Sequence, residues 1–153
     1  MSLSIRNRQR RVPVSLARLR RRATRALAAL GRADRDLHVT VVDDREIRQL
    51  NRRYLGARRS TDVLAFNLED PGLSCLLGEV IISAETAARQ AARLGIPAAL
   101  EMELLLVHGL LHLTGYDDHG SEDARAMHER TREILSAGRR SLPDRLWTGL
   151  LRR

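Results

Sequence analysis

The sequence predicts an α+β fold, a single domain in which a small mixed β-sheet packs against helices. Three short segments are rich in β-branched residues, whereas longer segments between and after them repeat their apolar residues with the period of a helix. The length of 153 residues and the hydrophobic content of 43% suit one domain with one core. We expect this domain to span residues 14–153, preceded by a loose basic arm over residues 1–13.

The first half of the domain is expected to alternate helices and strands. Ser15 is a preferred N-cap residue and Gly31 can end a helix, so residues 15–30 predict the first helix. Its apolar stripe suits packing better than it suits a transit peptide, which this Arg-rich start otherwise resembles. The next elements are a strand over 37–42, a helix over 43–56 with acids in its first turn, and a strand over 61–66.

The second half is expected to begin with a buried strand and continue with helices. The strand covers residues 76–83, and Ser83 caps the helix that follows it to Gly95. A long apolar helix runs from Pro97 to residue 114, and Gly115 ends it. The last predicted elements are a helix over 121–138 with Ser121 as its N-cap and a tail that docks through Leu146, Trp147 and Leu150.

The charge of the chain favours a polyanionic partner. The net charge is +8 and all basic residues are arginine, whose guanidinium group can donate two hydrogen bonds to one phosphate. Nine arginines fall between Arg6 and Arg25, which predicts either a nucleic-acid-binding surface or a solvated helix face. No apolar run is long enough to span a bilayer, so no membrane association is expected. The single cysteine, Cys75, fits a reducing cytosol and is expected to be buried.

Two histidines on the long apolar helix indicate a metal site. His108 and His112 are four residues apart, so both imidazoles lie on one face of the helix, one turn apart. Such a pair can bind one metal ion, or it can be a structural pair of core histidines. Gly115 favours the metal, because a left-handed turn there reverses the chain and brings Asp117, Asp118 and His119 back toward the helix. Three protein ligands with an open fourth position are typical of a catalytic zinc.

Peptide hydrolysis is a weaker interpretation of the same pair. Zinc peptidases place a glutamate directly after the first histidine as the general base, and Gly109 stands there instead. Glu101 and Glu103 precede the pair by one to two turns, and we expect both to lie on the surface.

The stretch HGLLHLTGYDDHG (108–120) resembles the signature H-G-x-L-H-L-x-G-Y-D-H of the YbeY family of bacterial rRNA maturation endoribonucleases. Three upstream segments are similar to the other conserved blocks of that family: LNRRYLG, STDVLAF and LLGEVIIS. The resemblance covers about residues 37–135. It implies an α+β fold, one zinc ion per chain, and metal-dependent cleavage of single-stranded RNA. The implied roles are 3′-end maturation of small-subunit rRNA and ribosome quality control in the bacterial cytoplasm, with RNA and the small ribosomal subunit as partners and no DNA substrate.

The chain departs from the family pattern at two positions that concern the site. The family arginine implicated in RNA cleavage corresponds to Leu55 here, and the nearby Arg58 and Arg59 are the candidates to contact the phosphate in its place, unless they are only surface charges. If they do not replace it, the alternative is a non-catalytic RNA-binding assembly factor with a structural metal. The other departure concerns the third metal ligand.

Strict family spacing puts that ligand at Asp118, with His119 as the alternative if the turn carries an extra residue. A family methionine commonly follows the third histidine by nine residues, and Met127 stands nine residues after Asp118. The turn is therefore expected to be substituted and not lengthened. Asp118 is the preferred third ligand, and His119 is expected beside the site or against the substrate.

Overall fold

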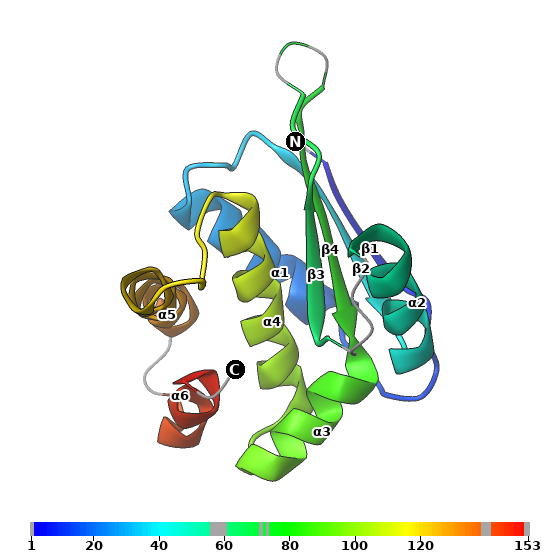
Figure 1. Ribbon diagram of the computed structural model, residues 1–153, viewed down its shortest axis with the longest axis vertical. Helices are drawn as coiled ribbons and strands as arrows, with labels where there is room; N and C mark the ends of the chain where they lie inside the picture. The colour runs from blue at the N-terminus through cyan, green and yellow to red at the C-terminus, as the bar shows by residue number, and fades with distance from the viewer. Residues whose placement is uncertain (1, 56–60, 71, 73, 139–141, 152–153) are drawn as a thin grey trace.

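The computed structural model describes residues 2–55, 61–70, 72, 74–138 and 142–151. The described part of the chain forms four strands and six helices (Figure 1). The strands are β1 (Leu3–Asn7), β2 (Asp36–Val42), β3 (Val63–Asn67) and β4 (Leu76–Ser83). The helices are α1 (Leu16–Ala29), α2 (Asp44–Leu55), α3 (Ala84–Leu94), α4 (Ala98–Leu113), α5 (Ser121–Ser136) and α6 (Asp144–Leu151).

The strands form one mixed sheet in the order β1-β2-β4-β3. β2 pairs in parallel with both β1 and β4, whereas β3 is antiparallel to β4. Helices α1 and α4 lie on one face of this sheet and α2 lies on the other (Figure 1). The predicted α+β class with a small mixed sheet is confirmed. Within the described residues no single helix is long and apolar enough to cross a bilayer, and α3 and α4 meet that test only together, as a pair bent by 118°.

The N-terminal residues differ from the predicted loose arm. β1 pairs with β2 from Leu3 opposite Leu37 to Asn7 opposite Val41, so it forms one edge of the sheet. Leu3 and Ile5 pack against the core, and Arg6 stays exposed. The strand was missed because two apolar residues among arginines give a weak sequence signal. Its position comes from the backbone hydrogen bonds that β2 offers along its free edge.

The core lies mainly between the sheet and α4. One apolar cluster joins the inner residues of β2 and β4 to α1, α3, α4 and α5, and a smaller one under α2 contains Val42, Ile47, Leu64 and Ile81. Helix α4 is buried on nearly all sides, which fixes the helix that carries both histidines at the centre of the fold.

Local signals placed most helix ends correctly. The Ser15 side chain accepts a hydrogen bond from the backbone N–H of Arg18, and the Ser83 side chain accepts one from Thr86, so both predicted N-caps are confirmed. The N-cap of α5 is Gly120, one residue before the predicted Ser121. Leu146 is buried as expected and Trp147 packs against the core, while the side chain of Leu150 lies outside the described part of the chain.

Three predictions about individual side chains are wrong. Cys75 is exposed, because it lies just before β4. Glu101 and Glu103 are 0% and 2% exposed, because α4 is surrounded by other elements and has no water-facing side there. Glu103 accepts hydrogen bonds from Nε of Arg18 at 2.7 Å and Nε of Arg22 at 3.0 Å. Part of the N-terminal arginine cluster is therefore structural: Arg22 is only 3% exposed and also donates to the carbonyl of Ile134.

A second polar cluster ties α2 to α3 at their N-terminal ends. One carboxylate oxygen of Asp44 accepts from the hydroxyls of Ser83 and Thr86, both at 2.6 Å. The other accepts from Nη1 of Arg89, also at 2.6 Å. Burial alone would raise the pKa of Asp44, but the hydrogen bonds from Arg89, Ser83 and Thr86 outweigh it and lower the pKa from 3.8 to about 2.

This lowered pKa predicts a loss of stability in acid. A carboxylate whose pKa is lower in the folded state stabilises the fold above its unfolded pKa, and it loses that contribution as the pH falls from about 4 to about 2. The shift corresponds to at most about 2 kcal/mol, for a side chain that is 16% exposed. Urea unfolding at pH 7 and at several pH values from about 4 down to about 2 would measure this loss. Asp44→Asn should be less stable than the wild type at neutral pH and should approach it in acid, and a constant difference would contradict the assignment.

Candidate metal centre

The two histidines of α4 lie one turn apart on the same face of the helix. Their ring centroids are 5.1 Å apart and the ring planes are inclined by 46°. His108 is 8% exposed and His112 is half-buried, so the pair extends from the protein interior toward the surface. The i, i+4 spacing directs both imidazoles to one point, as the sequence predicted.

The chain reverses directly after α4, as expected from Gly115. Gly115 has a φ of +100°, a conformation that glycine adopts at little cost. Its N–H donates to the carbonyl of His112 at 3.3 Å, and the N–H of Tyr116 donates to the carbonyl of Leu111 at 2.9 Å. These two bonds form a Schellman motif, which satisfies the last carbonyls of the helix. The residues after Tyr116 are thereby turned back along α4.

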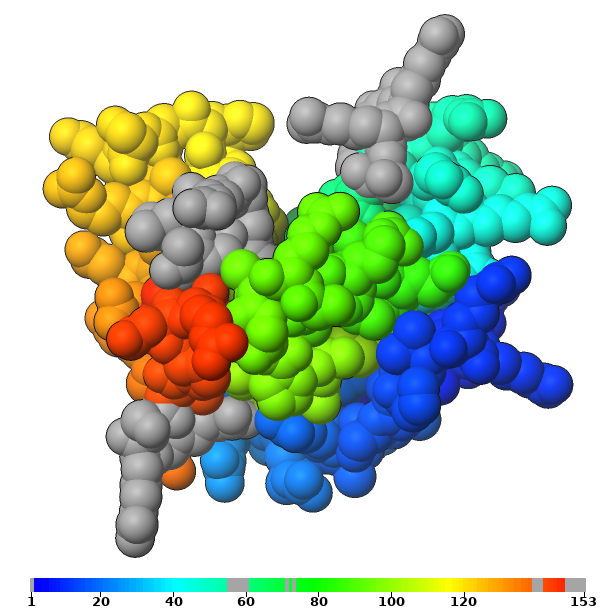
Figure 2. Space-filling model, turned by 90° about the horizontal axis from the view of Figure 1, so that it is seen from below, coloured from blue at the N-terminus to red at the C-terminus, as the bar shows by residue number. Residues whose placement is uncertain are grey.

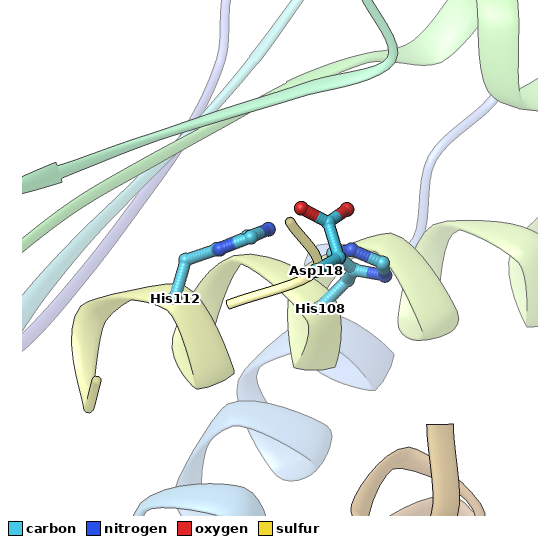
Figure 3. Close-up of side chains that lie close together, drawn as sticks. All are labelled: His108, His112 and Asp118. Atoms are coloured by element: carbon cyan, nitrogen blue, oxygen red, sulfur yellow. The ribbon is translucent and has the colours of Figure 1, made fainter. Parts of the chain in front are cut away.

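Asp118 lies on this returning segment, next to the two imidazoles. Its carboxylate and the ring of His112 point toward one another over the helix (Figure 3). One ligand atom from each of His108, His112 and Asp118 can be chosen so that all three lie within 4.8 Å of one another. Ligands around a tetrahedral zinc with bonds of about 2.0–2.2 Å are roughly 3.4 Å apart, so small side-chain rotations would close the group around one ion. The two nitrogens and one oxygen are donors that zinc accepts.

His119 points elsewhere. Its side chain is 86% exposed, and its Nε2 lies 3.3 Å from a carboxylate oxygen of Asp117. Asp117, Asp118 and His119 form a second, exposed group within 4.8 Å. Of the two candidates for the third ligand, the structure brings Asp118 and not His119 to the histidine pair.

Gly109 explains why the glutamate of a zinc peptidase has no place here. A Cβ on Gly109 would lie 2.6 Å from Cγ1 of Val80 and 3.3 Å from Cγ2 of Val63. The position after the first histidine therefore faces the sheet, and α4 can approach β3 and β4 closely only because no side chain stands there. A carboxylate at this position would be directed into the apolar core instead of toward a metal-bound water.

Comparison with known proteins agrees with this arrangement. The model of a family described as Endoribonuclease YbeY matches residues 4–138. The chain belongs to the YbeY endoribonuclease family. An endoribonuclease YbeY of Geobacter metallireducens is 44% identical over 142 residues, which cover 89% of this chain and 95% of that protein. One from Anaeromyxobacter dehalogenans is 49% identical over 121 residues, which cover 78% of this chain and 63% of that protein.

The fold has a structural counterpart as well. A solution structure of a Thermotoga maritima protein superimposes with a TM-score of 0.63 at 24% identity, covering 88% of this chain and 87% of that one. At this level of identity the likeness concerns the fold alone.

Part of the YbeY pattern falls outside the described structure. Leu55, which is expected at the position of the family arginine, is the last residue of α2, and its side chain is not described. Arg58 and Arg59 lie outside the described residues.

Two residues that position α4 were not singled out from the sequence. Nδ2 of Asn67, at the end of β3, donates to the carbonyl of Leu113 at 3.1 Å and so holds the last turn of α4 against the sheet edge. Gly78 on β4 leaves room for the same turn, because a Cβ there would lie 2.9 Å from Cδ2 of Leu113 and within 2.3 Å of the carbonyl oxygen of Phe66. The glycine could be noticed in the sequence, but its neighbours are distant along the chain.

Proposed function

We propose that this YbeY family member is a zinc-dependent endoribonuclease that hydrolyses single-stranded RNA. The observation that carries the proposal is the convergence of His108, His112 and Asp118 within 4.8 Å, inside the segment that the family model matches. The named relatives are endoribonucleases, which supports RNA as the substrate. We further propose the family's roles in small-subunit rRNA 3′-end maturation and ribosome quality control, acting on the small ribosomal subunit in the cytoplasm.

The site has an enclosed side and an open side, and its residues have different roles on each. His108 and His112 would bind zinc through ring nitrogens on the enclosed side, and Asp118 would complete the set from the exposed turn. Zinc bound there would polarise a phosphoryl oxygen and lower the pKa of a bound water toward about 7. The exposure of Asp118 and His119 leaves the open side accessible to an RNA strand, which His119 would contact. Arg58 or Arg59 would stabilise the charge that develops on the phosphate.

RNA affinity is expected to come largely from backbone charge. The net charge is +8, and Arg20, Arg21 and Arg25 are exposed on α1. The logarithm of the affinity for single-stranded RNA should fall with the logarithm of the salt concentration with a slope of several units. Reversing these three arginines to glutamate should weaken binding to all sequences about equally. Arg22 must be left out of such a variant, because its pairing with Glu103 is part of the core. A slope near zero in fluorescence anisotropy titrations would exclude this binding mode.

The proposed activity has a direct test. Purified protein with zinc should cleave a single-stranded oligonucleotide, and a chelator or His112→Ala should abolish the cleavage. RNA binding without cleavage by the wild type would identify a non-catalytic assembly factor with a structural metal instead. Chelator-sensitive cleavage of casein would point to a peptidase, which the packing around Gly109 argues against.

A further inference from the structure

A groove lies between α5 and α6, apart from the metal site. It has a volume of about 410 Å³, which is in the range of ligand pockets. Its lining residues are Ser121, Ala124, Arg125, His128, Glu129, Arg132 and Trp147. All but Trp147 come from α5, and they follow one another at intervals of one or three residues, so they form one face of that helix. Trp147 belongs to α6, beyond the residues 4–138 that the YbeY model matches, and α6 lies against α5 (Figure 2).

The groove combines cations with an aromatic ring. Arg125 and Arg132 are exposed, and His128 lies between them on the helix, with Glu129 as the opposing charge. The guanidinium carbon of Arg132 lies over the ring of Trp147, 5.0 Å from its centroid. Aromatic rings and arginine planes that stack on bases, beside cations that contact phosphates, are what proteins use to bind single-stranded nucleic acid. The apolar part of the lining suits a stacked base, and the cations at its edge suit the phosphates on either side of that base.

The position of the groove relates it to the metal centre. It begins at Ser121, three residues after Asp118, and continues along α5 away from that turn. The arginine-rich α1 is placed differently. Its residues Arg18 and Arg22 contact Glu103 of α4. Glu103 stands nine residues before His112, and at 3.6 residues per turn the side chains of Glu103 and His112 face opposite sides of α4. The groove therefore begins beside the turn that carries Asp118, whereas the α1 arginines that bind Glu103 lie on the side of α4 opposite His112.

We propose that the groove between α5 and α6 binds the part of a single-stranded RNA that flanks the cleaved phosphate. Arg125 and His128 contact its phosphates, and one base stacks on the Arg132–Trp147 pair. The proposal rests on the proposed ribonuclease function, which it deepens by assigning a substrate-binding surface. It also assigns a role to α6, which the metal centre does not use.

The chain provides its own reporter, because Trp147 is its single tryptophan. The zinc-loaded full chain would be titrated with a uridine oligonucleotide while tryptophan emission and the anisotropy of a labelled copy of the RNA are followed. Base stacking on the Arg132–Trp147 pair should quench the emission, with the same midpoint as the anisotropy. His112→Ala should show the same quenching, because the groove lies outside the metal ligands. RNA binding by anisotropy with unchanged emission would overturn the proposal.

Charge reversal tests the phosphate contact. Arg125→Glu should weaken RNA binding about tenfold and raise the KM for cleavage with little change in kcat, since a phosphate contact is lost away from the reacting atoms. Arg93→Glu, on the exposed face of α3, changes the net charge equally and should have a much smaller effect. Equal effects of the two variants would overturn the proposal.

The results also separate this proposal from the enzymatic one. Cleavage without quenching would leave the ribonuclease function standing and remove the groove from it. Quenching without cleavage would support the groove and remove the catalytic function. Emission that changes with protein concentration in the absence of RNA would show that a second copy of the chain occupies the groove, and it would overturn the RNA assignment.

Discussion

Asp118→Ala is expected to release the metal, whereas His119→Ala should retain it. Removing Asp118 takes away one of three ligands. Losing a residue that only hydrogen-bonds to a ligand typically weakens metal binding by about 10- to 100-fold, and losing a ligand itself should weaken zinc binding by more than that. The side chain of His119 is 86% exposed and directed to Asp117, so its loss leaves the three ligands in place. Zinc content after dialysis and a competitive chelator titration would measure both effects.

The same comparison has a stability readout. Metal that binds only the folded state stabilises it, so Asp118→Ala should lower the melting temperature of the zinc-loaded protein much more than that of the metal-free protein. His108→Ala and His112→Ala serve as positive controls, since each removes a nitrogen ligand. If His119→Ala lost the metal and Asp118→Ala kept it, the turn after Gly115 would have to rearrange on metal binding.

By the spacing of the family signature, a histidine is expected where this chain has Asp118. The variant Asp118→His tests the effect of that difference. A third imidazole in place of a carboxylate removes one negative charge from the site, which should make a metal-bound water a stronger acid. We therefore expect this variant to keep zinc and to shift the pH profile of RNA cleavage toward lower pH. An unchanged profile would show that the bound water does not control the rate.

Glu103→Gln replaces a buried residue and is expected to cause a larger loss of stability than any substitution at the surface. It leaves the guanidinium of Arg22 uncompensated, where both side chains are 2% exposed. Breaking one side of a buried ion pair costs about 3–5 kcal/mol. Urea unfolding would measure the loss. Glu133→Gln is a matched control, because it breaks an ion pair with Arg130 that is 2.7 Å long but in which the glutamate is 63% exposed. It should cost at most about 1 kcal/mol.

A double variant separates pairing from packing. Replacing Glu103 and Arg22 together by Leu and Met removes both charges and keeps apolar contact between α1 and α4. It should recover most of the stability lost in Glu103→Gln, because no buried charge is left without a partner: Arg22 is gone, and Arg18, the other cation that Glu103 binds, is 36% exposed and can be hydrated. A loss in Glu103→Gln no greater than in Glu133→Gln would mean that water or another anionic group compensates Arg22 at this position.

Features that depend on neighbours a few residues away could be predicted from the sequence. The spacing of His108 and His112 predicted their shared face, and Gly115 predicted the reversal that follows. The N-caps Ser15 and Ser83 were identified because a cap is made by a side chain and the backbone three residues on. Register with the family signature selected Asp118 before the structure placed it beside the histidines, and its role as a ligand stays a prediction.

Tertiary structure alone decided the features that depend on distant partners. β1 joins the sheet because β2 has a free edge, and Glu103 is buried because arginines 81 and 85 positions away in the sequence reach it. Gly109 faces Val80 of β4, so the reason for a glycine there became visible only once the helix and sheet were in contact. Burial and ion pairing are set by what packs against a side chain, and a residue's own sequence neighbours carry little information about it.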